Sequence, residues 1–329
     1  MPNSYISGLG HYVPPKCVTN KDLEKLMDTS DEWIVERTGI NTRHWVDIEN
    51  ESTSGMGTKA SLIAIENAGL KVSDIDFIIF CTLSPDYFFP GGGVLVQEQL
   101  GAGTIGALDI RNQCSGFVYG ISVADQFIKT GMYKNILVIG SEIQSTGMDI
   151  TTRGRNVSVI FGDGAGAAVV SATDELGKGI LSTHLHSEGK FAEELMAKDR
   201  CCTTPKEMPF AAESFYPVMN GNNVFKHAVT RFPEVINEAL TKNGYQSNDI
   251  NLLIPHQANL RISQFIQRSM KLRDDQVYNN IMNYGNTTAA SIPIALSEAW
   301  QKGLVNNGDI ICLAAFGSGF TWASALIRW

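Results

Sequence analysis

Long apolar runs are missing from this sequence of 329 residues. A helix that spans a membrane needs about 20 consecutive apolar residues, and no stretch of the chain approaches that length. Residues 1–8 also lack the basic stretch and the long apolar core of a secretory leader. We therefore expect a cytoplasmic protein that does not use a membrane as a partner.

Positive charge and paired cysteines are scarce as well. The chain has 26 Lys and Arg residues against 34 Asp and Glu residues, and its net charge is −8. A broad surface for nucleic acid is therefore not expected, and any basic patch must be local. None of the six cysteines belongs to a Cys-x-x-Cys pair, and the adjacent Cys201 and Cys202 fit neither a zinc signature nor a disulfide framework. This cysteine usage favours a reducing compartment.

Apolar residues are nevertheless plentiful, at 43% of the chain, and its length is enough for one large domain or two ordinary ones. Stretches rich in Ile, Val and Phe alternate with stretches of helical spacing. This alternation predicts a layered α/β protein.

Segments of this pattern recur along the chain. A helix, a glycine and a strand around Gly69 return around Gly244, 175 residues later. A second pair of helices ends at Gly131 and Gly303, which are 172 residues apart. Because several such pairs occur in the same order, the sequence predicts two similar halves.

A polar stretch joins the two predicted halves. The N-terminal half, 1–174, contains Cys114, and the C-terminal half, 175–329, contains His256 and Asn286. Cys114 and Asn286 are themselves 172 residues apart, so they occupy equivalent positions in the predicted repeat.

Cys114 is a candidate nucleophile. It follows a predicted buried strand at 106–110 and opens a predicted interior helix whose apolar residues extend to Ile128. The first N–H groups of a helix and the helix dipole favour an anion, so a thiol at this end is biased toward thiolate. The alternative is an inert cysteine that packs in the core, as free cysteines commonly do.

His256 and Asn286 are candidate partners of this thiol. His256 comes directly after a buried strand, at the loop end where α/β proteins assemble their sites. Taken alone, His256 is more typical of a structural histidine, and Asn286 is more typical of a helix N-cap. Equivalent strand ends in two halves that face each other can converge on one pocket. We therefore expect the Cys, His and Asn side chains to meet.

Segments around these residues carry a family signature. Four of them are Asn112-Gln113-Cys114-Ser115-Gly116-Phe117, Pro255-His256-Gln257-Ala258-Asn259, Tyr284-Gly285-Asn286-Thr287-Thr288 and Phe316-Gly317-Ser318-Gly319-Phe320-Thr321-Trp322. Three more are Thr29-Ser30-Asp31-Glu32-Trp33-Ile34, Arg37-Thr38-Gly39-Ile40 and Met219-Asn220-Gly221. Together they resemble beta-ketoacyl-[acyl-carrier-protein] synthase III over nearly the whole chain. The resemblance implies a thiolase-like fold, with two duplicated halves in αβαβα layers, in a homodimer.

The resemblance also implies a condensing acyltransferase that starts type II fatty-acid synthesis. Cys114 would take an acyl group from acyl-coenzyme A as a thioester. Malonyl-acyl-carrier-protein would then lose CO2, and neutral His256 and Asn286 would each donate a hydrogen bond to the enolate oxygen. The backbone N–H groups of Cys114 and Ser318 would hold the tetrahedral oxygen of the condensation. No metal or redox cofactor is implied, because coenzyme A enters only as the thioester substrate.

Further residues match family positions that bind the substrates. Those at the coenzyme A site are Thr29, Trp33, Arg37, Arg155, Phe225 and Asn259. Trp33 would stack on adenine with the Arg155 guanidinium on the other face. Phe89 would reach across the dimer to cap the acyl pocket of the partner. The basic residues that would dock an acidic carrier protein are Arg261, Arg268 and Lys271.

Two segments depart from the family pattern. Residues 91–93 are three consecutive glycines, which are expected to loosen the backbone near the acyl pocket. Residues 187–216 are expected to form a longer surface or lid segment than the family commonly shows. Both favour, as an alternative, a secondary-metabolite condensing enzyme or acyltransferase of the same fold with an unusual acyl donor.

More distant alternatives stay open on the sequence. A thiolase would use a second cysteine near the C-terminus, but Cys312 lies inside a predicted strand. A non-catalytic scaffold of the same fold would be expected to have lost the nucleophile. A nicotinamide oxidoreductase is disfavoured, because the glycines around Gly162 precede a strand rather than a phosphate-binding helix.

Overall fold

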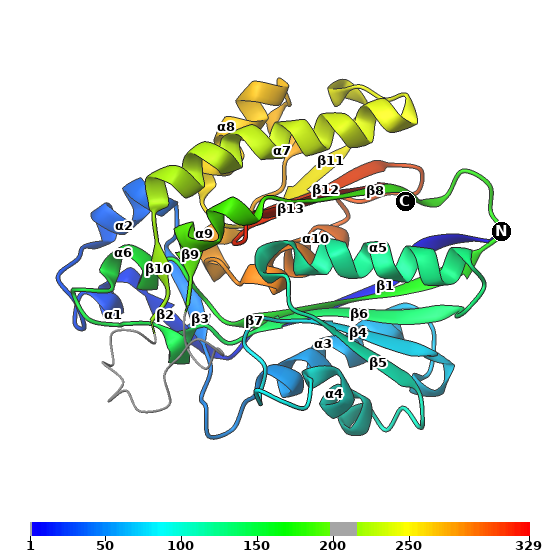
Figure 1. Ribbon diagram of the computed structural model, residues 1–329, viewed down its shortest axis with the longest axis horizontal. Helices are drawn as coiled ribbons and strands as arrows, with labels where there is room; N and C mark the ends of the chain where they lie inside the picture. Colours follow the sequence, from blue (N-terminus) through cyan, green and yellow to red (C-terminus); the bar gives the residue numbers. More distant parts are fainter. Residues whose placement is uncertain (1, 198–215) are drawn as a thin grey trace.

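The chain folds into five alternating layers of helices and sheets (Figure 1). The computed structural model describes residues 2–197 and 216–329. Two sheets are stacked with helices between them and on both outer faces, which confirms the predicted αβαβα arrangement. Within the described ranges, no helix combines the length and the apolar character needed to cross a bilayer. The adjacent Cys201 and Cys202 lie outside the described residues.

The first sheet is built from the N-terminal part of the chain. Its strands, in spatial order, are β1 (Asn3–Tyr12), β7 (Gly164–Thr173), β6 (Asn135–Glu142), β4 (Phe77–Cys81) and β5 (Gly106–Ile110). β4 runs parallel to both β5 and β6, whereas β7 is antiparallel to β1 and β6. The outer face is covered by α3 (Thr53–Asn67) and α4 (Gly92–Leu100). Met56 and Val96 of these helices are buried against the sheet.

The second sheet is built from the C-terminal part and repeats the same order. Its strands are β8 (Gly179–Ser187), β13 (Thr321–Arg328), β12 (Ile310–Gly317) and β11 (Leu252–Pro255). β11 pairs with β12 in parallel, and β13 is antiparallel to its two neighbours, as β7 is in the first sheet. The outer face is covered by α7 (Gly221–Asn243) and α8 (Leu260–Met270). Apolar residues at helical spacing on α7, such as Phe232 and Ile236, pack on this sheet.

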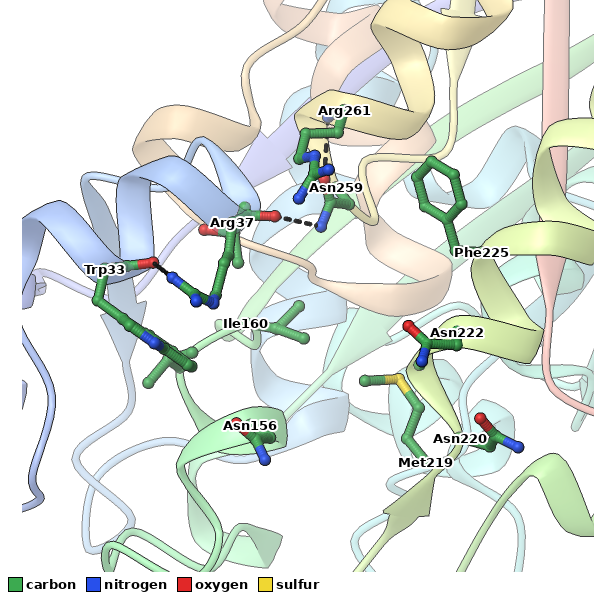
Figure 2. Close-up of a pocket in the computed structure, with 13 residues that line it drawn as sticks. Trp33, Arg37, Asn156, Ile160, Met219, Asn220, Asn222, Phe225, Asn259 and Arg261 are labelled. Carbon is green, nitrogen blue, oxygen red and sulfur yellow. Dashed lines mark hydrogen bonds between the residues drawn. The ribbon is translucent and has the colours of Figure 1, made fainter.

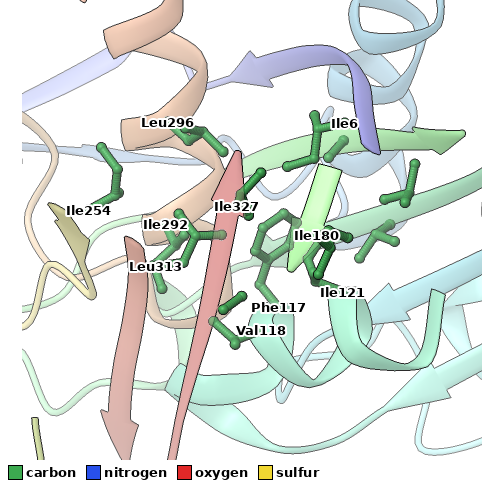
Figure 3. Close-up of a cluster of buried hydrophobic side chains, with 14 of the residues drawn as sticks. Ile6, Phe117, Val118, Ile121, Ile180, Ile254, Ile292, Leu296, Leu313 and Ile327 are labelled. Atoms are coloured by element: carbon green, nitrogen blue, oxygen red, sulfur yellow. The ribbon is translucent and has the colours of Figure 1, made fainter. Parts of the chain in front are cut away.

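The middle layer consists of α5 (Gly116–Lys129) and α10 (Ser291–Gln301). Figure 3 shows Phe117 and Ile121 of α5 packed among residues of both sheets, with Ile292 and Leu296 of α10 in the same cluster. Residues that the two sheets contribute to this cluster include Ile6, Ile180, Ile254, Leu313 and Ile327. Each such side chain contributes about 1.5–3 kcal/mol through burial. The largest apolar core of the described residues is therefore shared between the two parts of the chain.

Equivalent positions of the predicted repeat adopt equivalent backbone geometry. Gly69 and Gly244 have φ angles of 68° and 73°, values that favour glycine. The Asp74 and Asp249 carboxylates each accept a backbone N–H three residues earlier in the chain, at 2.8 and 2.7 Å. The predicted boundary falls in the connection between β7 and β8. We propose on this basis that 1–174 and 175–329 are duplicated halves.

Shorter elements flank the layers. The helices are α1 (Asn20–Leu23), α2 (Asp31–Thr38), α6 (Arg155–Ser158) and α9 (Ile281–Tyr284). The strands are β2 (Lys16–Thr19), β3 (Thr42–Trp45), β9 (Leu195–Met196) and β10 (Val218–Met219). The 3₁₀ turns are η1 (Val72–Asp74), η2 (Gln113–Ser115), η3 (Ser145–Gly147), η4 (Gly189–Glu194), η6 (Ser247–Asp249), η7 (Asp274–Gln276) and η8 (Thr288–Ala290). Of these, α1, α2, β2, β3, α6 and α9 gather at one end of the layers (Figure 1).

Two predictions around the cysteine are wrong in part. The strand at 106–110 exists as β5, but it is an edge strand and Leu108 is exposed, because only β4 pairs with it in the described chain. Cys114 does not open the following helix either. It lies in the separate turn η2, and α5 begins at Gly116.

The prediction of a loose glycine segment is also wrong. The N–H groups of Gly92 and Gly93 donate to the Asp109 carboxylate at 2.6 and 2.9 Å. A Cβ atom at Gly92 would lie 2.5 Å from the Phe80 ring. The glycines therefore allow α4 to begin close against the sheet, and they fix the backbone there rather than loosening it.

The described part of the predicted lid segment has regular structure. Residues 187–197 contain η4 and β9, and β9 pairs with β10 beyond the undescribed residues. The Phe191 ring lies 4.2 Å from the His227 ring and 5.3 Å from the Phe320 ring. This stretch is therefore packed against α7 and the turn before β13.

Candidate functional site

Cys114 is buried in the turn η2, and only 7% of its surface is exposed. The backbone N–H groups of Cys114 and Ser318 form hydrogen bonds with the Cys114 sulfur. Ser318 follows β12, whose last residue, Gly317, approaches so closely that a Cβ atom there would lie 3.2 Å from the same sulfur. The thiol is thus held between its own turn and the end of β12.

The electrostatics of Cys114 differ from the sequence prediction. Burial, followed by the nearby Glu142 carboxylate, raises the pKa of the Cys114 thiol to about 12. The two backbone N–H groups lower the pKa, but by less than burial raises it. The expected bias toward thiolate is therefore wrong, because a charge in an apolar enclosure loses its hydration.

His256 follows β11 and is buried. Its backbone N–H donates to the Ala314 carbonyl of β12 at 2.8 Å, which continues the pairing of β11 with β12. The Nδ1 atom lies 2.6 Å from the Ser291 hydroxyl, whereas the buried Nε2 atom has no hydrogen-bond partner among the described residues. Burial lowers the pKa of His256 to about 3. The imidazole is therefore neutral at physiological pH.

Asn286 is buried between two segments of backbone. It forms a β-bridge with Phe161, and its N–H donates to the Ile160 carbonyl at 2.8 Å. The side-chain oxygen accepts the Thr288 N–H at 2.8 Å. That bond assigns the oxygen side of the amide, so the NH2 group is left to donate.

The segment 286–291 links the three predicted side chains. It begins at Asn286, and Ser291 at its end contacts His256. Between them, η8 packs against η2, the turn that carries Cys114. Gln113 and Thr288 in these two turns have φ angles of 44° and 47°, which cost about 1–3 kcal/mol each for residues other than glycine. The fold therefore brings the two turns together even though each is strained.

A cavity of about 360 Å³ opens at Cys114, and we call it the Cys114 cavity. Ser318, Thr288 and Phe161 line it beside the cysteine. The other lining residues are Leu83, Ser84, Pro85, Phe88, Arg111, Gln113, Ile143, Gln144, Thr146, Gly147, Met148, Leu195, Met196, Ala197 and Pro217. Part of the predicted lid segment, at 195–197, therefore forms cavity wall.

A second hollow of about 570 Å³ lies between α2, α7 and α8 (Figure 2), and we call it the Trp33 groove. Its lining includes four residues that the sequence predicted to bind coenzyme A, namely Trp33, Arg37, Phe225 and Asn259. Arg261 lines it too, although the sequence assigned this residue to carrier-protein docking. Lining residues for which the sequence predicted no role are Thr38, Asn156, Val159, Ile160, Met219, Asn220, Gly221 and Asn222.

The Asn259 side chain is already engaged in this groove. Its Nδ2 group donates to the Arg37 carbonyl at 2.9 Å, and its oxygen accepts the Arg261 N–H at 2.9 Å (Figure 2). It thereby caps the N-terminus of α8 and ties that helix to α2. Asn259 shapes the groove through these two bonds.

Two guanidinium groups crowd the Trp33 ring. The Cζ atom of Arg37 lies 4.4 Å from the ring centre, and that of Arg155 lies 5.2 Å away. An aromatic base between Trp33 and a guanidinium needs about 7 Å, because each stacked layer takes roughly 3.5 Å. Neither guanidinium leaves that space in this arrangement, and Arg155 also bonds to the Asp28 carbonyl. Thr29 lies outside the groove, and its buried hydroxyl has no partner in the described chain.

The remaining predicted residues lie apart from both hollows. Phe89 is 81% exposed, and its neighbour Phe88 lines the Cys114 cavity. Arg268 is exposed near the end of α8, and Lys271 follows that helix with a φ angle of 55°. Within the described ranges, neither Arg268 nor Lys271 forms an ion pair.

Three residues near the cysteine were missed by the sequence interpretation. Glu142 is fully buried, and its carboxylate accepts hydrogen bonds from the Ser84 hydroxyl and the Leu83 N–H. Gln144 forms part of the wall of the Cys114 cavity. Ser291 contacts His256. The sequence interpretation contained no signal for Glu142, the last residue of β6, or for Gln144, two residues later. Ser291 stands unmarked in a run of small residues.

Comparisons with known proteins agree on one family. Residues 108–189 match the family described as 3-Oxoacyl-[acyl-carrier-protein (ACP)] synthase III, and residues 240–329 match the family of its C-terminal part. The beta-ketoacyl-[acyl-carrier-protein] synthase III of Caldanaerobacter subterraneus is 46% identical over 325 residues, 98% of this chain and 97% of that protein.

Solved structures give the same result. The 3-oxoacyl-[acyl-carrier-protein] synthase III of Aquifex aeolicus superposes with a TM-score of 0.92 at 42% identity, covering 99% of this chain and 100% of the other. The priming beta-ketosynthase of the R1128 polyketide pathway has a TM-score of 0.90 at 30% identity, with coverage of 99% and 96%. The predicted thiolase-like fold is thereby confirmed. The chain therefore belongs to the beta-ketoacyl-[acyl-carrier-protein] synthase III family, and it is an acyltransferase of the decarboxylating condensing type.

Proposed function

We propose that Cys114 takes an acyl group from acyl-coenzyme A and passes it to malonyl-acyl-carrier-protein with loss of CO2, giving a beta-ketoacyl-acyl-carrier-protein. The observation that carries this assignment is the Cys114 sulfur at the wall of a cavity, between the N–H groups of Cys114 and Ser318. Asn286 stands on the segment packed against the same turn, and the neutral His256 contacts Ser291 at the end of that segment.

In the first half-reaction the Cys114 sulfur attacks the thioester carbonyl. The bond from that carbonyl to the coenzyme A sulfur breaks, and the thiol proton passes to the departing sulfur. The N–H groups of Cys114 and Ser318 lie where the negative oxygen of the tetrahedral intermediate forms. One such donor is typically worth about 3 kcal/mol in the transition state.

In the second half-reaction the malonyl carboxylate leaves as CO2. Its bonding electrons pass into the thioester as an enolate, whose oxygen accepts hydrogen bonds from His256 Nε2 and Asn286 Nδ2. The enolate carbon then attacks the acyl carbon, and the thiolate of Cys114 departs and is reprotonated from solvent. Because His256 is neutral, it supplies a hydrogen bond without adding a positive charge beside the leaving CO2.

The Trp33 groove is the proposed coenzyme A site. Trp33 offers a ring for the adenine, and Arg37 and Arg155 offer cations for phosphate groups at the same end, with Thr29 nearby. Phe225 and Asn259 lie further along the groove, on the side of α7 and α8 (Figure 2).

Surface residues support the proposed protein partners. Arg261, Arg268 and Lys271 form no ion pair with described residues, so their charge is available to an acidic carrier protein. The free side of the edge strand β5 and the exposed Phe89 suit a homodimer in which Phe89 caps the partner's cavity. A reaction without metal or redox cofactor and a cytoplasmic location stay predictions from the sequence and its resemblance.

Mass spectrometry after incubation with acyl-coenzyme A tests the first half-reaction. One acyl group is expected on the wild type and none on Cys114→Ala. The matched control is Cys17→Ser, because Cys17 is an exposed thiol outside the cavity lining and its loss should leave acylation unchanged. A wild-type enzyme that stays unlabelled, or labelling that follows Cys17, would contradict the proposal and favour a non-catalytic scaffold.

A secondary-metabolite condensing enzyme with an unusual acyl donor is the second candidate. The wall of the Cys114 cavity includes Arg111, Gln113 and Gln144 among its apolar residues, and a polyketide priming synthase is among the similar structures. Feeding acyl-coenzyme A donors of graded length, with and without a terminal hydroxyl or carboxyl group, separates the two candidates. Preference for short apolar donors supports fatty-acid initiation, and preference for polar donors supports the second candidate.

A further inference from the structure

We propose that Ser291 is a positioning residue that fixes the tautomer of His256, so that the Nε2 atom carries the proton. That the Nε2 proton forms a hydrogen bond to the enolate oxygen rests on the proposed function. The tautomer itself is a property of the resting enzyme and can be measured without any substrate.

The contacts of Ser291 are few and well defined. Its hydroxyl oxygen lies 2.6 Å from His256 Nδ1, and the backbone N–H of Gln257 donates to the same oxygen at 3.3 Å. Ser291 and His256 are both buried. Within the described residues, the Ser291 hydroxyl has no further hydrogen-bond partner.

Counting protons decides which atom donates. A serine hydroxyl has one proton to give, and a neutral imidazole has one N–H and one bare nitrogen. Gln257 already supplies a donor to the Ser291 oxygen, so the hydroxyl proton is free to point at Nδ1. If Nδ1 carried the proton instead, the oxygen would accept two N–H groups and the buried hydroxyl proton would have no acceptor. The arrangement therefore favours Nδ1 as the acceptor and Nε2 as the N–H.

The surroundings keep this neutral tautomer in place. Ser291 is the first residue of α10, so the positive end of the helix dipole lies beside Nδ1 and disfavours an imidazolium. Burial lowers the pKa of His256 in the same direction. Nε2 is a buried polar atom without a partner in the described chain. Such atoms are uncommon in folded proteins, and here it is a donor left open for a ligand oxygen.

The nitrogen resonances of His256 test the tautomer directly. In wild-type enzyme labelled with ¹⁵N-histidine, and assigned by comparison with His256→Gln, we expect a protonated Nε2 and an unprotonated Nδ1. A spectrum with the proton on Nδ1 would overturn the proposal. Because this measurement uses the wild type without substrate, it decides the proposal even if the Ser291 variants do not fold.

Variants separate a positioning role from a structural one. We expect Ser291→Ala to slow decarboxylation of malonyl-acyl-carrier-protein about tenfold, the effect of one lost hydrogen bond, and to leave acylation of Cys114 unchanged. Ser291→Thr keeps the hydroxyl and should restore most of the rate. The matched control is Ser297→Ala, because Ser297 lies on the same helix and contacts a different histidine, His11, at 2.9 Å. That control should change neither half-reaction.

Two outcomes would overturn the positioning role. One is a Ser291→Ala enzyme that decarboxylates at the wild-type rate, and the other is an equal loss of acylation and decarboxylation in that variant. Failure of the proposed function would look different. In that case the wild type would show neither Cys114 acylation nor decarboxylation, while the nitrogen spectrum would still report the tautomer.

Discussion

Replacing Gly317 with alanine should move the nucleophile. A Cβ atom at residue 317 would lie 2.7 Å from the Cys114 Cβ atom and 3.2 Å from both its N and Sγ atoms. Carbon atoms in contact sit about 3.5–4.0 Å apart, so the turn that carries Cys114 must shift by about 1 Å. Overpacking of this kind costs about 1–3 kcal/mol of stability, and a 1 Å misplacement of a reacting group costs about a hundredfold in rate.

The rate of Cys114 acylation from acyl-coenzyme A, followed by mass spectrometry over time, measures this effect. We expect Gly317→Ala to remain folded, with a lowered melting temperature, and to acylate about a hundredfold more slowly. Gly189→Ala is the matched control, since an added Cβ there meets no described atom within 4 Å. If Gly317→Ala acylates at the wild-type rate, the close approach of β12 does not position the sulfur, and the reasoning is refuted.

Three further predictions concern the residues around the two hollows. Asn286→Ala should slow decarboxylation about a hundredfold, because the enolate oxygen loses one hydrogen-bond donor, while acylation of Cys114 continues. An equal loss of rate in both half-reactions would contradict that role. His256 has a pKa of about 3 in the folded protein, against about 6.5 for a histidine exposed to water. The unfolded chain therefore binds an extra proton between these values, so stability falls as pH drops from 6.5 toward 3, by up to about 5 kcal/mol. Denaturant titrations at several pH values should show a shallower fall in His256→Gln, and an unchanged slope would show that burial of this imidazole is not responsible. Trp33→Ala should weaken acyl-coenzyme A binding about tenfold, within the usual range for loss of one stacked base. The reaction of an acyl-pantetheine donor should stay unchanged, because that donor has no adenine. An equal loss with both donors would show that Trp33 acts through the fold.

The sequence predicted the layers because they depend on the order of apolar segments along the chain. Apolar spacing marks the strand before His256 and the helix after Cys114, and both exist, as β11 and α5. The repeat offset predicted that Cys114 and Asn286 occupy equivalent positions, and the structure packs η8, which follows Asn286, against the turn that carries Cys114. Such features follow from local spacing and from topology, which the sequence expresses directly.

What failed depends on neighbours that are distant in sequence. The exposure of Leu108 follows from the absence of a second strand beside β5 in the described chain, and no pattern within the strand records this. The raised pKa of Cys114 follows from its burial and from Glu142 on another strand. Ser291 gains its significance only from its contact with His256. Enclosure and charge are properties of the assembled site, whereas the helix-terminus argument considered one element alone.

The shared middle layer has a consequence for how this chain can be divided. α5 and α10 belong to different parts of the sequence, yet their side chains enter one cluster with residues of both sheets. A fragment that ends at residue 174 would therefore expose an apolar surface that none of its own helices or strands can cover. The remaining fragment, from residue 175 onward, would expose a matching apolar surface. Cutting the exposed connection near Leu176, which is 93% exposed, should yield two pieces that stay associated and regain structure only when mixed. The two parts of this chain are therefore expected to fold only together.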